Sequence, residues 1–113
     1  MLIPKAKYVR DRKHRMFIAS LPCLISNRDD TQAAHIRKGN GGGVGLKPSD
    51  IYCVPLSVDQ HRLQGEIGEV GFWEPYMGYK RASKLARELY GVTGDRGKAL
   101  ELIGEWNNEI YNL

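Results

Sequence analysis

Two histidines, His35 and His61, bracket the segment that most limits what this chain can fold into. Residues 31–36 form a short run around His35 that predicts a strand, although alanine favours strands only weakly. Residues 39–45 hold five glycines in seven positions, which predicts a loop. Residues 51–56 are the best strand candidate, and a helix is predicted from about residue 58. The order of parts is therefore strand, loop, strand and helix, with His61 near the start of the helix.

Helical patterns flank this segment on both sides. Asp11 predicts the N-cap of a helix that ends before Pro22. Apolar residues at the spacing i, i+3, i+4 and i+7 predict a helix over 81–90, which Gly91 ends. Asp95 predicts the N-cap of a last amphipathic helix.

Together these patterns predict a single α+β domain over residues 1–113. A small ββα core is expected at about 20–75, with an N-terminal helix before it and C-terminal helical support at about 80–112. The aromatic residues of 71–79 are predicted to close the core, because such clusters do so more often than they bind a ligand.

Positive charge is concentrated in the first half of the chain. Residues 1–47 contain ten Lys and Arg against three Asp and Glu, whereas residues 48–113 contain seven against ten. A basic half of this kind suits a polyanion such as DNA, and a solvated basic face is an equally good interpretation. Arg37, Lys38 and Lys47 border the glycine-rich loop and are predicted to contact phosphates, or alternatively to serve solubility.

Other sequence features predict the cellular location of the protein, the burial of its cysteines and the exposure of His14. No apolar run is long enough for a membrane span, and the basic N-terminus lacks a signal-peptide core, so a cytoplasmic protein is expected. Cys23 and Cys53 are too few for a disulfide framework and are predicted to be buried thiols. His14, on a basic helix, is predicted to lie at the surface. The sequence leaves the oligomeric state open.

Several segments, taken in order, resemble phage and prophage HNH (ββα-metal) endonucleases, in the branch similar to the Ref recombination nuclease. They are RDRKH at 10–14, SLPCL at 20–24, AAHIR at 33–37, GVGLKPSD at 43–50, VPL at 54–56 and GEVGFW at 68–73. The resemblance covers roughly residues 5–105. It implies the same ββα fold predicted above, and a phage origin with the host cytoplasm as location.

The resemblance also implies a structural zinc site, from which this chain departs. The family carries a C-x-x-C pair and a later V-P-L-C-x-x-H-H-x-x-x-H segment. Here Cys23 is kept, but the other implied ligand positions hold Ser26, Ser57 and Gln60. Neutral serine and glutamine oxygens are poor zinc ligands, so the sequence predicts a domain that folds without structural zinc.

Some of the family's catalytic and metal-binding residues are also replaced in this chain. His35 matches the general base that deprotonates a water molecule, and His61 matches a ligand for Mg²⁺ or Mn²⁺. Gly65 stands where the family has its last histidine, and Ala34 stands where many HNH enzymes have a metal-binding aspartate. Three nearby carboxylates are candidates to join His61 as metal ligands, with Glu69 preferred because it belongs to the family's Gly-Glu pair: Asp59, Glu66 and Glu69.

Three function classes follow. The first is a catalytically degenerate HNH-fold protein that binds DNA or a host protein, for example as an inhibitor of a host defence nuclease. The second is a working metal-dependent endonuclease that nicks DNA with His35 as general base. The third is a structural phage component that uses the fold as a scaffold. The replacement of most of the family's metal ligands favours the first class, the catalytically degenerate binding protein.

Overall fold

The predicted strands form an antiparallel hairpin in the computed structural model, which describes residues 9–40 and 48–111. Strand β1 (Thr31–His35) pairs with β2 (Cys53–Ser57), in a register that sets His35 opposite Cys53. A short 3₁₀ turn, η1 (Asp50–Tyr52), leads into β2. Helix α2 (Val58–Ile67) follows β2 without a loop, because the Ser57 hydroxyl accepts a hydrogen bond from the Gln60 amide and caps the helix. The hairpin and α2 are the predicted ββα unit.

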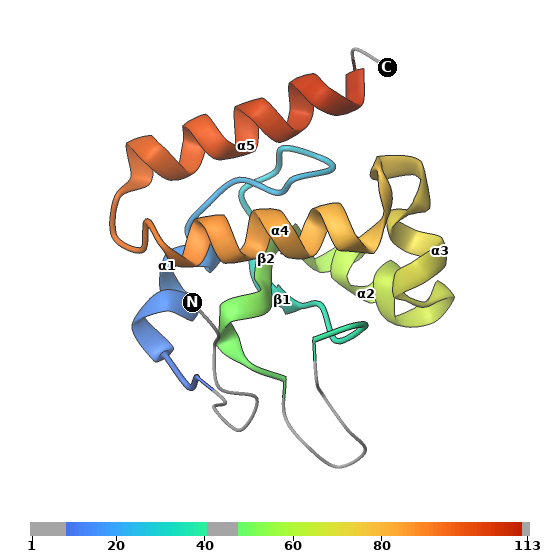
Figure 1. The fold of residues 1–113 in the computed structure, drawn as a ribbon, viewed down its shortest axis with the longest axis horizontal. Helices are drawn as coiled ribbons and strands as arrows, with labels where there is room; N and C mark the ends of the chain where they lie inside the picture. The colour runs from blue at the N-terminus through green and yellow to red at the C-terminus, as the bar shows by residue number, and fades with distance from the viewer. Residues whose placement is uncertain (1–8, 41–47, 112–113) are drawn as a thin grey trace.

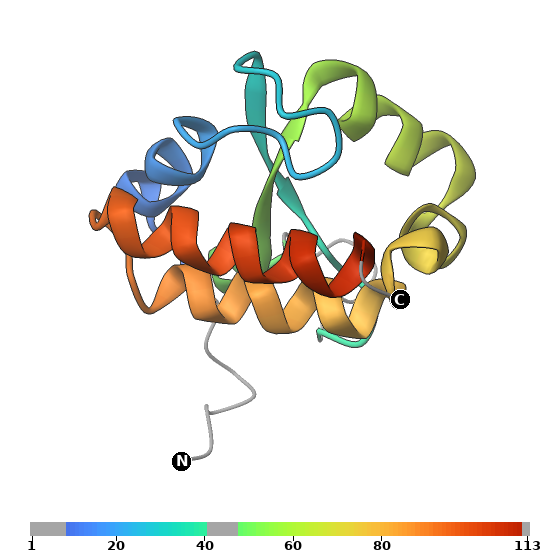
Figure 2. The ribbon, with the colours of Figure 1, turned by 90° about the horizontal axis from the view of Figure 1, so that it is seen from above.

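Helices surround this unit. Helix α1 packs on both strands, and α4 packs on β2 and η1. Figures 1 and 2 both show α5 running antiparallel beside α4, as their short connection requires. The bounds are α1 Arg12–Ala19, α3 Glu69–Trp73, η2 Glu74–Tyr76, α4 Gly78–Tyr90 and α5 Arg96–Tyr111. The fold is therefore α+β, as predicted.

An aromatic cluster joins the C-terminal helices to the ββα unit. Trp73 and Trp106 are buried and meet edge to face, with ring centroids 6.3 Å apart. The Trp73 indole Nε1–H donates to Gln64 Oε1 at 2.7 Å, so its one polar atom is satisfied inside the core. Phe72 is also buried, which confirms that the aromatic residues of 71–79 close the core.

Most predicted element ends are confirmed. The Asp11 side chain accepts from the His14 amide and begins α1, and α4 ends at Gly91. Helix α4 starts at Gly78, earlier than the apolar spacing predicted, after Met77 turns the chain with φ +70°. Both cysteines are buried, as predicted. Within the described ranges, no helix is both long and apolar enough to cross a bilayer.

The prediction that His14 lies at the surface is wrong. His14 is a completely buried residue of α1, and its ring makes an edge-to-face contact with Tyr90, with ring centroids 4.9 Å apart. Its Nδ1 lies 2.7 Å from the Thr93 hydroxyl, whose own hydrogen is donated to the Tyr90 carbonyl. Nδ1 therefore carries the hydrogen, and the buried Nε2 has no partner among the described residues. Such a ring is accommodated in its neutral form.

Acidification should consequently weaken the fold through His14. Burial lowers the pKa of His14 below its ordinary value of 6.5, although Asp11 and Asp50 oppose this. Because the unfolded chain then binds the proton more readily, stability falls as pH drops below 6.5 and is complete above it. Each unit by which folding lowers the pKa of His14 corresponds to a loss of about 1.4 kcal/mol in the free energy of unfolding at low pH. Urea unfolding between about pH 7 and pH 5 should show this loss in the wild type and a smaller one in His14→Leu. If the free energy of unfolding depended equally on pH in the two proteins, the buried neutral state of His14 would be contradicted.

Candidate functional site

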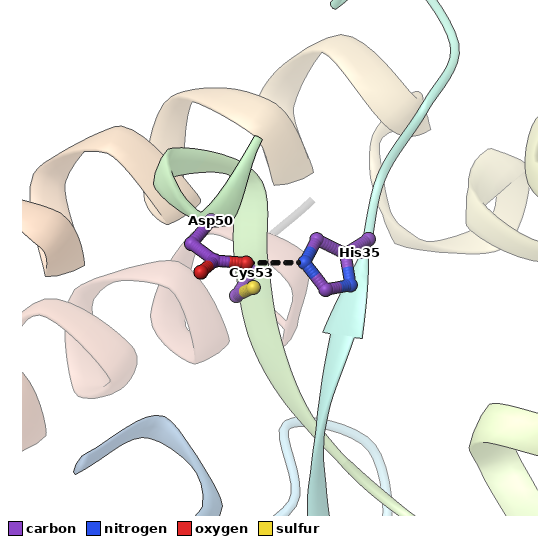
Figure 3. Close-up of side chains that lie close together, drawn as sticks. All are labelled: His35, Asp50 and Cys53. Carbon is purple, nitrogen blue, oxygen red and sulfur yellow. Dashed lines mark hydrogen bonds and ion pairs between the residues drawn. The ribbon is translucent and has the colours of Figure 1, made fainter. Parts of the chain in front are cut away.

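A buried carboxylate, Asp50, organises the site. Its Oδ1 accepts from His35 Nε2 at 2.8 Å and from Arg10 Nη1 at 3.4 Å. Its Oδ2 accepts from the Asp11 amide at 2.6 Å and from the Arg15 guanidinium. The Asp50 side chain has no exposed surface, and the four donors come from the segment around the start of α1 and from the end of β1. Asp50 thus ties the N-terminal helix to the hairpin, and Figure 3 shows it beside His35 and Cys53.

The charge state of Asp50 fixes the state of His35. Burial alone would raise the pKa of Asp50, but hydrogen bonds from His35, the Asp11 amide and Arg15 hold it below its ordinary value of 3.8. An ionised carboxylate only accepts hydrogen bonds, so His35 Nε2 carries a hydrogen, and in the neutral form of the ring Nδ1 carries the lone pair. Nδ1 has no hydrogen-bond partner among the described residues. This is the arrangement of a histidine held ready to accept a proton.

Four of the predicted site residues line one surface pocket of about 410 Å³. They are His35, Arg37, His61 and Glu69, and Gly65 lines the pocket with them. His35 ends β1 and Arg37 follows it, α2 contributes His61 and Gly65, and the start of α3 contributes Glu69. The ββα unit therefore places both predicted histidines on the same pocket.

His61 is oriented by a residue that the sequence did not single out. Its Nδ1 lies 2.7 Å from Gln32 Oε1 on β1, so Nδ1 donates and Nε2 keeps its lone pair. Burial and the neighbouring His35 lower the pKa of His61 below 6.5, which keeps the ring neutral near neutral pH. Neutral imidazole is the form that binds a metal ion or accepts a hydrogen bond.

Glu69 holds the backbone that leaves β1. Its carboxylate accepts from the Arg37 amide at 3.0 and 2.9 Å and from the Lys38 amide at 2.7 Å. Both oxygens are therefore engaged before any ion arrives, which makes Glu69 a better support for the strand end than a metal ligand. The other two carboxylate candidates, Asp59 and Glu66, are exposed and do not line the pocket.

The structure describes two of the three predicted phosphate-binding residues. The Arg37 and Lys38 side chains are exposed next to the end of β1. Lys47 and most of the glycine-rich loop lie outside the described residues.

One grouping in the described part of the chain brings three metal-ligand side chains within 4.8 Å: His35, Asp50 and Cys53. Its chemistry fits a cation poorly. Both Asp50 oxygens already accept charged or amide donors, and two arginines supply positive charge. Burial raises the pKa of the Cys53 thiol to about 12, so it is protonated at neutral pH.

A second polar cluster joins the segment after α1 to the start of α2. The Ser26 amide donates to Cys23 Sγ at 3.4 Å, and the Ser26 and Ser57 hydroxyls lie 3.5 Å apart. The Gln60 amide donates to the Ser57 hydroxyl at 3.4 Å. Burial alone would raise the pKa of Cys23, but hydrogen bonds from Ser26, Ser57 and Ile25 lower it overall.

Comparison with known proteins identifies the family of this chain. The model of a family described as "protein of unknown function (DUF968)" matches residues 1–84. The chain belongs to the DUF968 family. The DUF968 match includes α1, the hairpin, α2, α3 and the first half of α4, and with them every residue of the pocket, while α5 lies beyond it. Neither the curated proteins nor the solved structures gave a match.

Two site residues escaped sequence reasoning, Asp50 and Gln32. Asp50 begins the turn η1 that leads into β2, and an acidic residue directly before the apolar run 51–56 was the available signal. Gln32 carried no signal of its own. It faces His61 only because β1 runs past the start of α2.

Proposed function

We propose that this DUF968 protein is an HNH-fold protein of phage origin that binds a DNA backbone phosphate in the His35–His61 pocket and has lost most of its ability to cleave. One observation carries the proposal: a histidine at the end of β1 and a histidine on α2 line the same pocket of a ββα unit. The resemblance to HNH endonucleases implies that arrangement, and it adds phosphodiesters as the substrate class.

The Cys23–Ser26–Ser57–Gln60 cluster supports the HNH resemblance. These are the four positions at which the family has its structural zinc ligands, and here they are joined by hydrogen bonds from the segment after α1 to the start of α2. Positions that bind one metal ion must adjoin in space. The contact between Ser26 and Ser57 brings the two segments together, as a shared zinc site would require, while Gln60 takes part through its backbone amide alone.

The chemistry of the pocket favours binding a phosphate over cleaving it. Arg37 lines the pocket and is exposed, so it can pair with a phosphate oxygen. The Glu69 charge is directed at two backbone amides. For a metal ion, His61 Nε2 is the one protein ligand suitably placed on α2, and a single imidazole holds a divalent ion weakly.

DNA binding should be sensitive to salt and to Arg37. Fluorescence anisotropy with a short labelled duplex should show affinity falling steeply between about 50 and 200 mM salt, because released counterions drive binding. Arg37→Gln should weaken binding and reduce the salt slope by about 1, the contribution of one phosphate contact. Lys98→Gln, an exposed charge on α5 away from the pocket, is the matched control. No binding at low salt would sink the proposal and would make a host-protein partner, sought by pull-down, the next candidate.

The His35–Asp50 pair favours a second candidate function, a metal-dependent endonuclease. In it, His35 Nδ1 would take the proton of the attacking water, and Asp50 would stabilise the resulting imidazolium. A divalent ion at His61 would supply charge stabilisation on the phosphate.

Plasmid nicking in Mn²⁺ tests this candidate. If the protein is active, His35→Ala should lower the nicking rate by about 10²- to 10⁴-fold, the usual contribution of a general base. Lys98→Gln should keep the wild-type rate. Nicking equal in wild type and His35→Ala would indicate a contaminating nuclease, and a lack of both nicking and DNA binding would leave a host-protein partner or the scaffold role.

A further inference from the structure

A second hollow, of about 300 Å³, lies between the end of β1 and one face of α4. The segment after β1 contributes Lys38 and Asn40, and α4 contributes Lys80, Ser83 and Arg87. The three α4 residues stand at the spacing i, i+3 and i+7, so they share one face of the helix. None of the sequence-based assignments covers these α4 residues.

The charge of this hollow has one sign. Lys38, Lys80 and Arg87 supply three cationic groups, and no carboxylate is among the described residues that line it. Arg81 of α4, in contrast, is paired, because it bonds Glu109 of α5 and lies close to Glu88. An unneutralised concave group of three cations attracts an anion with several oxygens.

The floor of the hollow holds a hydroxyl with a hydrogen to donate. Ser83 is 5% exposed, and its Oγ accepts from Asn40 Nδ2 at 3.0 Å. The same Asn40 nitrogen also donates to the Ile36 carbonyl at 2.9 Å, which fixes the amide in place. No acceptor for the Ser83 hydroxyl hydrogen occurs among the described residues. A buried hydroxyl of this kind is suited to an anionic oxygen above it.

We infer that this hollow binds a phosphate group, which under the proposed function belongs to the same DNA backbone as the phosphate in the His35–His61 pocket. Consecutive residues connect the two sites, since Arg37 lines the pocket and Lys38 lines the hollow. The Glu69 carboxylate holds both of their amides, so the spacing between the sites is fixed by β1 and α3. The inference rests on the proposed function for the source of the phosphate, and on the hollow itself for the phosphate chemistry.

A pair of double variants with equal charge change tests the inference. Lys80→Gln/Arg87→Gln removes two cations from the hollow, whereas Lys84→Gln/Lys98→Gln removes two exposed cations that do not line it. The positive charge of Lys84 instead helps to lower the pKa of Glu109 on α5. In anisotropy titrations the first variant should lose about tenfold in DNA affinity and about 1 in salt slope relative to the second.

A second measurement separates the inference from the proposed function. Inorganic phosphate should shift the NMR amide signals of Gly39, Asn40 and Ser83 in the wild type, and much less in Lys80→Gln/Arg87→Gln. If the wild type binds DNA but the two double variants bind equally, the inference is wrong and the proposed function stands. If DNA does not bind while phosphate still shifts these signals, the hollow is a phosphate site and the proposed function is wrong. If DNA does not bind and phosphate causes no shift, both are wrong.

Discussion

Replacing Asp50 with asparagine should lower the free energy of unfolding by about 2–3 kcal/mol, because a buried charge loses its hydrogen bonds while the arginines left behind are partly exposed to solvent. The carboxylate accepts from Arg10, Arg15, the Asp11 amide and His35. A neutral amide leaves the guanidinium charges uncompensated and offers one acceptor atom where two were used. Urea denaturation followed by tryptophan fluorescence would measure the change, because Trp73 and Trp106 are both buried in the core.

The matched control is Asp59→Asn, which removes an exposed carboxylate from the first turn of α2. Its effect should stay below about 1 kcal/mol, the range of a helix-dipole interaction at the surface. The Asp50 effect should also depend on pH. Because the folded-state pKa of Asp50 lies below 3.8, its contribution is complete above that pH and is lost as pH falls through the folded value. A loss similar to that of Asp59→Asn at neutral pH would refute the organising role of Asp50.

Replacing Gly65 with histidine should strengthen metal binding at His61. Residues 61 and 65 are one turn apart on α2, so two imidazoles would stand on the same face of the helix. A side chain at position 65 has room, because no atom other than those of its chain neighbours and the nearby backbone of α2 lies within 4 Å of the Cβ that it would add. His61 Nε2 already has its lone pair available. Affinity for Zn²⁺ or Mn²⁺, measured by calorimetry, should rise by about tenfold or more.

Two controls isolate the effect of the second imidazole. Gly65→Ala reproduces the gain in helix propensity without a ligand. Glu66→His adds a histidine at an exposed position that does not line the pocket. If the shortened metal shell is what limits cleavage, Gly65→His should also raise Mn²⁺-dependent plasmid nicking, and a further His35→Ala change should abolish the gain. Metal affinity equal to that of Gly65→Ala would show that His61 does not point its free nitrogen toward position 65.

The parts of the fold that local chemistry determines could be predicted from the sequence. Asp11 begins α1 and Gly91 ends α4, because capping depends on one side chain and a few backbone groups. The hairpin followed directly by α2 was also predicted, and it alone is enough to bring His35 and His61 to one pocket. The regular apolar spacing of the last two helices specified them equally well.

The parts that depend on distant partners could not be predicted in this way. His14 lies in a basic, polar stretch of sequence. It is nevertheless buried, because it contacts the Thr93 hydroxyl on the α4–α5 connection and the ring of Tyr90. In the sequence Asp50 is only a polar residue before an apolar run, and its role appears when Arg10 and Arg15, which lie before and within α1, bond to it in the fold. Glu69 stays a candidate metal ligand on sequence grounds, but the sequence cannot show that its oxygens also accept hydrogen bonds from two amides.

The bonds from Arg10, Asp11 and Arg15 to Asp50 span 35 to 40 residues of chain, and this has a consequence for biosynthesis. On the ribosome, α1 emerges long before its acidic partner. Until then its arginines remain solvated and the short helix has little to hold it, since isolated helices of this length are marginal in water. The nascent N-terminal segment should therefore stay open until η1 has been translated, and His35 gains its orienting carboxylate in that same step.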